Sequence, residues 1–557
     1  MVDTRTKVAK VSDGLRSLAF GNPLYSLSLG HGGPTFLEVV PPDPWPGDAE
    51  RGSALASGEY SFAGRTLVSD VPLWLPLGVG DAYLEALHGF DWLRDLRALG
   101  GDTARRHARA LVASWIDRHN SWHAVVWRPD VLGRRVANWL GMHDFFCASA
   151  DDHFRARTFA SLARQTRHLA RALPGGLKGA PLLAALKGLF YGILCLPDGR
   201  PRLEPALKLL LQELQAQVLP DGGHVQRNPQ IHLEALRHLI DIRGAMRAAR
   251  TEVPEALQHA IDKMAPALRF FRHGDGGLAL FNGAREGEPV LIDTVLAQAD
   301  AHGRPLKSGR HSGFERVQAG RLLLLMDVGP PPAPGLDSGA HAGALSFELS
   351  VGRERLIVNC GAWGGFDPDP QGEAAGWETA LRGTAAHSTL TAADTNSSEL
   401  IDGGGLGRRP RQVTAERLEE DRSVLLEAEH DGYRAPYGAR HNRRLFIGAG
   451  GDDLRGEDTL TGAADLPFAV RFHLHPAVHV SPLQGGDAAL LKLASGAGWR
   501  LRVSGAALTV EESIYCGEDV AVRRSSQIVL SARTGADKKA PTSVKWALKR
   551  ERRDRDG

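Results

Sequence analysis

The stretch GAHAGALSFELSVGRERLIVNCGAW, residues 339–363, decides how the second half of the chain folds. Apolar residues occupy every second position from Leu345 to Val351, which is the period of a strand with one buried face. Gly352 and the charged residues after it predict a turn, and the apolar run that follows predicts a returning strand. We therefore predict a β-hairpin, with His341 at the entrance of its first strand and in phase with the apolar positions.

The chain before this hairpin has a helical period instead. Apolar residues recur along one side of residues 81–99, and similar segments follow with short connections that carry Gly or Pro. The further helices are expected near residues 104–119, 131–147, 152–173, 179–195, 203–218, 231–249 and 254–271. After the hairpin, short alternating runs bounded by Gly and Asp predict strands. Helices followed by strands predict an α+β multidomain protein, with an all-α unit of paired helices before a β-sandwich.

The length of 557 residues is also more than one ordinary core requires, so two or three domains are expected. Residues 1–80 are rich in Pro and Gly and are expected to be irregular. We assign residues 81–305 to the helical domain and 306–545 to the β-sandwich. The charged residues 546–557 are expected to form a frayed tail.

Composition excludes several classes of protein. The formal net charge is only +2, which gives no support for a nucleic-acid or membrane partner. No segment approaches the length of a transmembrane span, and the N-terminus lacks the apolar region of a secretory signal. The cysteines are scattered without CxxC spacing, as expected for free thiols in a reducing compartment: Cys147, Cys195, Cys360 and Cys516. These features predict a cytoplasmic protein.

Common catalytic motifs are missing from the sequence. It contains no HExxH, no P-loop and no GxSxG elbow. Its GDGG and GGG segments are predicted to be turns, because no βαβ unit surrounds them. The sequence therefore argues against a zinc protease, a nucleotide-binding enzyme and an α/β-hydrolase.

The segment FAVRFHLHP, residues 468–476, is predicted to be a strand with one basic face. Arg471, His473 and His475 alternate with apolar residues and point to the same side. This face could be exposed, or it could form a polar interface between domains. Alternatively, it is a cationic strip that faces an anionic substrate.

The segment DGGHVQRNPQIH, residues 221–232, joins a turn to the start of a helix. His224, Arg227, Asn228 and His232 are expected to cluster there, on a loop and a helix N-terminus that would suit an anion. The alternative is ordinary helix capping beside a surface histidine.

Two further segments carry residues suited to sugar acids. Arg135 and Asn138 are three residues apart and should share one helix face, with Trp139 adjacent. They offer bidentate charge, hydrogen bonds and a stacking surface, which are what a sugar acid needs. In EHDGYRAPYGARHNRR, Tyr433 lies close to other aromatic and basic residues, although turn packing would explain the same cluster.

Seven segments in order resemble the heparinase II/III family of polysaccharide lyases and cover most of residues 80–480. They are HGFDWLRDLRAL, WRPDVLGRRVANWL, PDGGHVQRNPQIHLEAL, AHAGALSFELSVG with LIVNCG, RGTAAHSTLTAADTNSS, HDGYRAPYGARHNRRL and RFHLHP. The resemblance implies an incomplete (α/α) toroid, then an antiparallel β-sandwich, with a substrate cleft between them. It also implies β-elimination of an anionic, uronic-acid-containing polysaccharide.

This reaction requires three tasks of the protein. The uronate carboxylate must be neutralised, a base must remove the C5 proton, and an acid must protonate the leaving O4. Our candidates for the catalytic groups are His232 as the base and Tyr433 as the acid, together with His224 and His341. The candidates for neutralising or holding the substrate are Arg135, Asn138, Trp139, His224, Arg227, Asn228, Arg471 and His473.

The metal-binding positions of the family are altered in this chain. The resemblance aligns them with Gly339, His341, Asn359 and His387, so one histidine is missing and an amide replaces a carboxylate. Asn is a much poorer ligand for a divalent metal, so no metal or other cofactor is expected. His341 and His387 should be neighbours that either contact substrate or fix the strand entrance.

Two other functions remain open. A glycoside hydrolase on a toroid would need two carboxylates across a sugar site, and Asp130, Asp144 and Asp221 form no convincing pair. A non-catalytic glycan-binding or assembly protein of surface polysaccharide metabolism would explain the altered catalytic positions. The family resemblance, unlike the cytoplasmic prediction, would favour the periplasm or cell envelope.

Overall fold

The computed structural model describes residues 18–30, 32–70, 74–364, 376–518 and 522–551. The chain divides into two compact units, one of residues 1–216 and 234–261 and the other of residues 217–233 and 262–557. Helical segments after residue 262 therefore share a unit with the sheets. This division differs from the boundary expected after residue 305.

Most of the long helices expected from the sequence are present, with ends within a few residues of the predicted ones, but the segment 131–147 is two helices, which end at Gly141 and Phe146. In chain order the helices are α2 (Pro23–Ser28), α3 (Ala49–Ala56), α4 (Asp81–Gly89), α5 (Leu93–Leu99), α6 (Gly101–His119), α7 (Pro129–Gly141), α8 (His143–Phe146), α9 (Asp152–Ala172), α10 (Ala180–Cys195), η1 (Arg200–Arg202), α11 (Leu203–Gln217), α12 (Pro229–Ala248), α13 (Glu255–Phe270), α14 (Pro289–Ala299), α15 (Trp377–Arg382), η3 (Thr384–Ala386) and α16 (Arg434–Tyr437). The helical part of the fold is thus an incomplete (α/α) toroid, as predicted.

Three further parts of the helical prediction are corrected. The segment 81–99 is two helices, because Phe90 adopts a left-handed conformation with φ of 60° and ends α4. The first eighty residues include helix α3 and the hairpin of β1 (Glu59–Phe62) and β2 (Arg65–Val68). Helix α14 was not predicted at all.

Glycine allows the central helices of the first unit to approach closely. A Cβ atom added to Gly133 of α7 would lie 2.6 Å from the Ala185 Cα atom of α10, and one added to Gly188 would lie 2.3 Å from the Gly133 Cα atom. Such contacts are too short for any larger side chain, so both positions require glycine. In the described part of the chain, no helix combines the length and apolarity that crossing a membrane would require.

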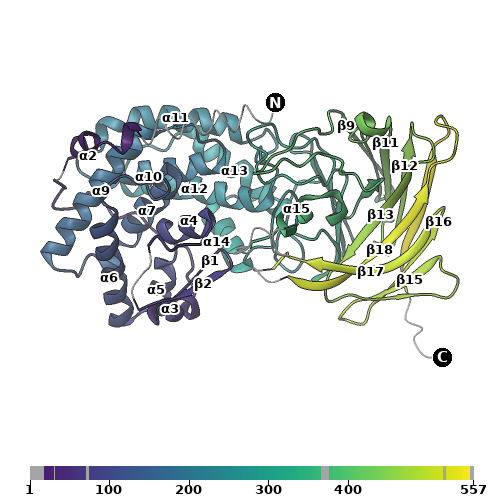
Figure 1. Ribbon diagram of the computed structural model, residues 1–557, viewed down its shortest axis with the longest axis horizontal. Helices are drawn as coiled ribbons and strands as arrows, with labels where there is room; N and C mark the ends of the chain where they lie inside the picture. Colours follow the sequence, from purple (N-terminus) through teal and green to yellow (C-terminus); the bar gives the residue numbers. More distant parts are fainter. Residues whose placement is uncertain (1–17, 31, 71–73, 365–375, 519–521, 552–557) are drawn as a thin grey trace. The chain divides into compact units, whose positions relative to one another are not determined.

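The second unit is built mainly from antiparallel strands, as the alternating runs predicted (Figure 1). Besides β1 and β2, the strands are β3 (Ser308–Gly309), β4 (Phe314–Ala319), β5 (Leu322–Asp327), β6 (Phe347–Val351), β7 (Glu354–Val358), β8 (Leu390–Ala392), β9 (Val413–Glu420), β10 (Ser423–His430), β11 (Arg440–Ile447), β12 (Asp453–Thr461), β13 (Pro467–Leu474), β14 (His479–Pro482), β15 (Ala488–Lys492), β16 (Gly498–Ser504), β17 (Ala507–Tyr515), β18 (Arg523–Arg533) and β19 (Thr542–Arg550). The predicted hairpin is formed by β6 and β7, paired through Val351 and Glu354.

Two sheets stack to form the sandwich. Within the described residues, one has eight strands in the order β14-β15-β16-β19-β12-β11-β10-β9. The other contains β17-β18-β13-β7-β6-β5-β4-β3, with β8 beside β13. Phe347 of one sheet stacks on Trp546 of the other, with ring centroids 5.9 Å apart. The core therefore lies between the sheets.

The C-terminal charged tail was predicted to begin at residue 546, which is too early. Residues 546–550 belong to β19, which lies between β12 and β16 inside the eight-stranded sheet. Trp546 and Leu548 are buried, whereas Lys545 and Lys549 point outward. Residues 552–557 of the predicted tail lie outside the described residues.

A buried charge network joins the two sheets. Arg443 donates to the Asp458 carboxylate at 2.7 Å and to the carbonyls of Leu345 and Ser388 at 2.8 Å each. His441 and Trp546 also bond to Asp458. Because the Arg443 guanidinium lies nearest, the pKa of Asp458 is held far below its usual range despite burial.

Candidate functional site

His341 and His387 are neighbours, as the family resemblance implied. His341 Nδ1 lies 3.2 Å from His387 Nε2, and His387 Nδ1 lies 2.8 Å from the Gly383 carbonyl oxygen. These contacts fix the tautomers of both rings. His387 donates its Nδ1–H to the Gly383 carbonyl, so its Nε2 is free to accept the Nδ1–H of His341. His341 lies in the loop that leads into β6, which begins at Phe347, so it stands at the entrance of the strand as predicted.

This pair is neutral and enclosed. Both side chains are buried, and burial lowers the pKa of His387 to about 4 and that of His341 well below its usual value. Asn359, the altered family position, accepts a hydrogen bond from Ser388 N at 3.0 Å and donates to the Leu280 carbonyl. The Asn359 amide is therefore hydrogen-bonded to backbone groups, and the two histidines are hydrogen-bonded to each other.

The loop 217–233 packs within the unit that holds the sheets. Arg227 donates to the backbone carbonyls of Ser312, Gly313 and Pro330 and pairs with Asp327. The guanidinium is thus used to fasten this loop, and it is only 7% exposed. It does not offer the free positive charge expected of a substrate-binding residue.

The other polar residues of this loop are occupied in the same way. His224 lies 3.0 Å from the Gln217 side-chain oxygen, and burial lowers its pKa to about 3. Asn228 caps α12 by accepting from the backbone of Gln230 and Ile231, as the alternative interpretation proposed. The contacts of these polar side chains hold the loop in place within the unit.

The predicted base and acid have separate surroundings. His232 Nε2 lies 2.9 Å from the Met264 carbonyl of α13, and burial lowers its pKa to about 4. Tyr433 is completely buried and donates to the Leu390 carbonyl at 2.7 Å. Burial raises the pKa of Tyr433 above its usual value. Neither group is exposed in the structure, and their roles as base and acid stay predictions.

The predicted residues of α7 lie inside the helical unit. Arg135 is fully buried and donates to the Gln165 side chain and to the carbonyls of His88 and Val126. Asn138 and Trp139 are also buried. These side chains lie on one helix as predicted, and their contacts are with other helical residues.

On β13, His473 is buried and Arg471 is half-buried. His473 Nδ1 lies 2.8 Å from the Ser513 hydroxyl, and Nε2 lies 2.9 Å from the Ala385 carbonyl. His473 also borders a hollow of about 580 Å³ with Ser513 and Arg524. His473 is thus one residue of the predicted strip that borders a hollow, although burial lowers its pKa to about 3.

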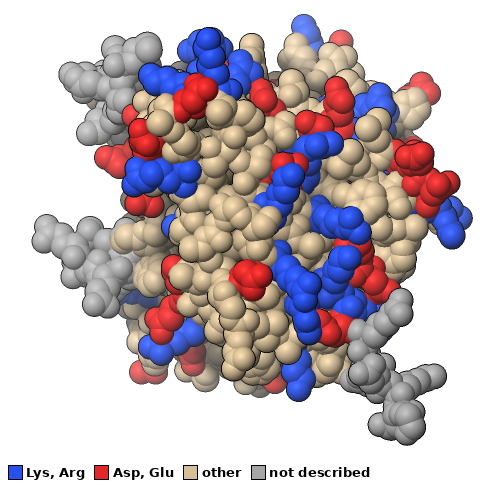
Figure 2. Space-filling model, turned by 90° about the vertical axis from the view of Figure 1, so that its right-hand side faces the viewer, with Lys and Arg blue, Asp and Glu red and all other residues tan. Residues whose placement is uncertain are grey.

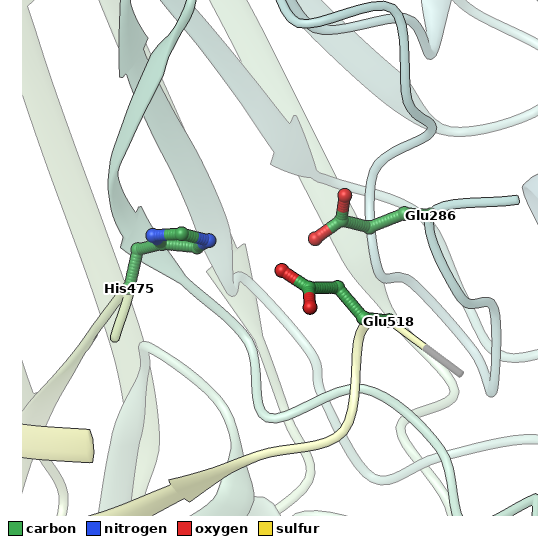
Figure 3. Close-up of side chains that lie close together, drawn as sticks. All are labelled: Glu286, His475 and Glu518. Carbon is green, nitrogen blue, oxygen red and sulfur yellow. The ribbon is translucent and has the colours of Figure 1, made fainter. Parts of the chain in front are cut away.

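One cluster was missed by sequence reasoning. In the described part of the chain, Glu286, His475 and Glu518 offer ligand atoms that all lie within 4.8 Å of one another, and Figure 3 shows the side chains converging. A divalent cation could fit three such ligands. However, Glu286 Oε2 lies 3.5 Å from an Arg355 nitrogen, and Glu518 pairs with Arg523 at 2.5 Å. Arg523 balances Glu518, whereas Arg355 lies closer to Asp275, at 2.6 Å, than to Glu286.

Comparison with known proteins agrees with this architecture. A helical toroid followed by stacked antiparallel sheets defines a polysaccharide-lyase fold. The sequence matches "Heparinase II/III N-terminus" over residues 101–301 and "Heparinase II/III-like, C-terminal" over residues 301–547. The chain belongs to the heparinase II/III family.

Individual relatives support this family and its fold. The solved structure of heparinase III superposes with a TM-score of 0.73 at 14% identity, covering 87% of this chain and 80% of that one. Heparan sulfate lyase HepC from Pedobacter heparinus gives a TM-score of 0.61 at 15% identity, covering 91% and 83%. FtsZ-localized protein C of Caulobacter vibrioides is 35% identical over 95% of this chain and 93% of its own length.

Proposed function

We propose that this protein is a non-catalytic member of its family that binds an acidic polysaccharide without cleaving it. The observation that carries the proposal is the enclosure of the expected acid–base groups: His232 and Tyr433 are buried and bonded to backbone carbonyls. A general base and acid must come within hydrogen-bond reach of the C5 proton and of O4. Buried groups with these partners do not meet that requirement.

We further propose that the protein functions without a metal or organic cofactor. The amide of Asn359 bonds to Ser388 and Leu280, and His341 bonds to His387. A metal at the family position would have to break this hydrogen bond and accept an amide in place of a carboxylate.

The experiment is a turnover assay on a panel of acidic polysaccharides, with an active heparinase as the positive control. We expect no rise in unsaturated-uronate absorbance at any protein concentration, together with measurable glycan binding. Turnover that is abolished by His232→Ala and Tyr433→Phe would establish the lyase alternative, with β-elimination by the candidate base and acid.

A second role concerns FtsZ. The relative named FtsZ-localized protein C is similar over nearly the whole chain, so we propose that this protein also associates with FtsZ. We place it in the cytoplasm, where its four buried free cysteines would remain reduced. Co-sedimentation with purified FtsZ filaments, and fractionation of the host, test these two statements separately. Recovery of a processed form in the periplasm would contradict the second.

A further inference from the structure

The outer face of the eight-stranded sheet carries a hollow that sequence reasoning did not find. Its volume is about 640 Å³, and basic side chains from four strands, Arg444, Arg455, Arg502 and Lys545, line it. Its two carboxylates are Glu457 and Asp487, so the lining has a formal charge of +2, four minus two. Figure 2 shows Lys and Arg side chains gathered along the middle of the molecular face that bears this sheet.

Strand register places the lining residues in rows. One row, which we call the central row, crosses β16, β19, β12, β11 and β10. Its paired residues are Arg502, Ala547, Arg455, Phe446 and Leu425. All five point outward, because their neighbours along each strand are buried in the core. Arg502 and Arg455 are therefore separated across the sheet by Ala547 alone, and Phe446 lies beside Arg455.

The small side chain of Ala547 creates the depth of the hollow. Beneath the sheet, a Cβ atom on Gly456 would lie 2.1 Å from the Trp546 ring, so the indole fills the inner side at this point. On the outer side, nothing larger than a methyl group stands between Arg455 and Arg502. These cations are two strand spacings apart, which is roughly 10 Å between backbones.

Most of the lining cations already have a carboxylate partner. Glu457 lies 3.5 Å from Lys545 and 3.8 Å from Arg444, and Arg444 also lies 3.3 Å from Glu427. Arg455 is paired with Asp453, whereas no ion pair joins Arg502 to another residue in the described part of the chain. All four cations are exposed, so an anion could reach them.

We propose that this face binds an acidic polysaccharide whose carboxylates occur on alternate sugars. Two consecutive sugar rings span about the distance between Arg502 and Arg455, so one repeat would place a uronate on each cation and the intervening ring over Ala547. Arg455 lies over the Phe446 ring, 5.7 Å from its centroid, so the ring adds apolar surface beside this cation. This inference rests on the proposed glycan-binding function and names its site.

An acidic peptide fits this face less well. Peptides commonly join a sheet through a free edge, where backbone groups are unpaired. Here β19, β12 and β11 are interior strands whose two sides are both paired. The hollow therefore offers only side chains, set at a spacing that suits rings and carboxylates.

The test measures the anisotropy of a labelled hyaluronan octasaccharide, which is acidic on alternate sugars and carries no sulfate. Arg455→Ala/Arg502→Ala is expected to raise the Kd about tenfold in low salt, with a smaller effect at higher ionic strength. Ala547→Phe keeps every charge but fills the hollow, so it should weaken binding to a similar extent. The matched control is Arg105→Ala/Arg106→Ala on α6, which should bind like wild type.

Unchanged affinity in both sheet variants, with wild-type binding intact, would overturn this site but leave the proposed function standing. No binding of any acidic glycan by the wild type would overturn both. Equal binding of a labelled glutamate octapeptide, with the same dependence on Arg455 and Arg502, would also overturn the glycan site, because it would show a general response to negative charge. Unaltered unfolding midpoints confirm that the exposed variants are folded.

Discussion

Acidification is predicted to destabilise the sheet-bearing unit through the buried His387. This imidazole is 2% exposed, and its pKa falls from about 6.5 in the unfolded chain to about 4 in the folded protein. Between these values the unfolded chain binds more protons than the folded protein. Stability is therefore fully present above pH 6.5 and decreases as the pH falls toward 4.

The linkage relation gives the magnitude. For one group with these two pKa values, lowering the pH from 7 to 5 costs about 2 kcal/mol of unfolding free energy. His387→Gln removes the titrating group but keeps a side chain that can donate to Gly383. This variant should therefore lose about 2 kcal/mol of the wild-type pH dependence over that interval.

Urea unfolding followed by tryptophan fluorescence at pH 5, 6 and 7 tests the argument. The quantity compared is the difference in unfolding free energy between wild type and variant at each pH, because contributions from histidines that do not contact His387 then cancel. His259→Gln, at a histidine whose side chain is 62% exposed, is the matched control and should retain the wild-type pH dependence. Equal pH dependence in wild type and His387→Gln would refute the enclosed, neutral state of this histidine.

Three other outcomes are expected. Asp458→Asn leaves the buried Arg443 without its counter-charge and should cost about 3–5 kcal/mol in urea unfolding; a loss below about 1 kcal/mol would contradict the network described above. Tyr433→Phe removes one hydrogen bond to Leu390 and should cost about 1 kcal/mol without changing glycan affinity; a large loss of affinity would place Tyr433 in contact with the ligand. Elemental analysis of protein purified without added metal should find no stoichiometric zinc, and one zinc per chain that disappears in His387→Gln would contradict the proposal.

The fold could be predicted because its periodicities are local. Helical spacing and strand alternation depend on neighbouring residues, and both are clear in this sequence. The break at Phe90 was missed because a left-handed residue other than glycine gives no composition signal. β19 was missed for a different reason: Val544, Trp546 and Leu548 do alternate, but the lysines and arginines around them suggested a tail.

The site was harder to predict because spacing fixes a shared face but not what covers it. Arg135 and Asn138 do lie on one helix, yet neighbouring helices enclose them. His341 and His387 could be paired only through the family resemblance, since 46 residues separate them. The central row of the outer sheet depends on strand order and register, which bring together residues from five separate strands.

The most direct test combines binding and product analysis in one sample. The protein is mixed in excess with a size-defined heparan sulfate or hyaluronan oligosaccharide, its bound fraction is measured by anisotropy, and the same sample is analysed by mass spectrometry after prolonged incubation. We predict saturable binding and an oligosaccharide of unchanged mass. Shorter products with an unsaturated uronate at the non-reducing end would contradict the account, because they would show that this chain is a lyase.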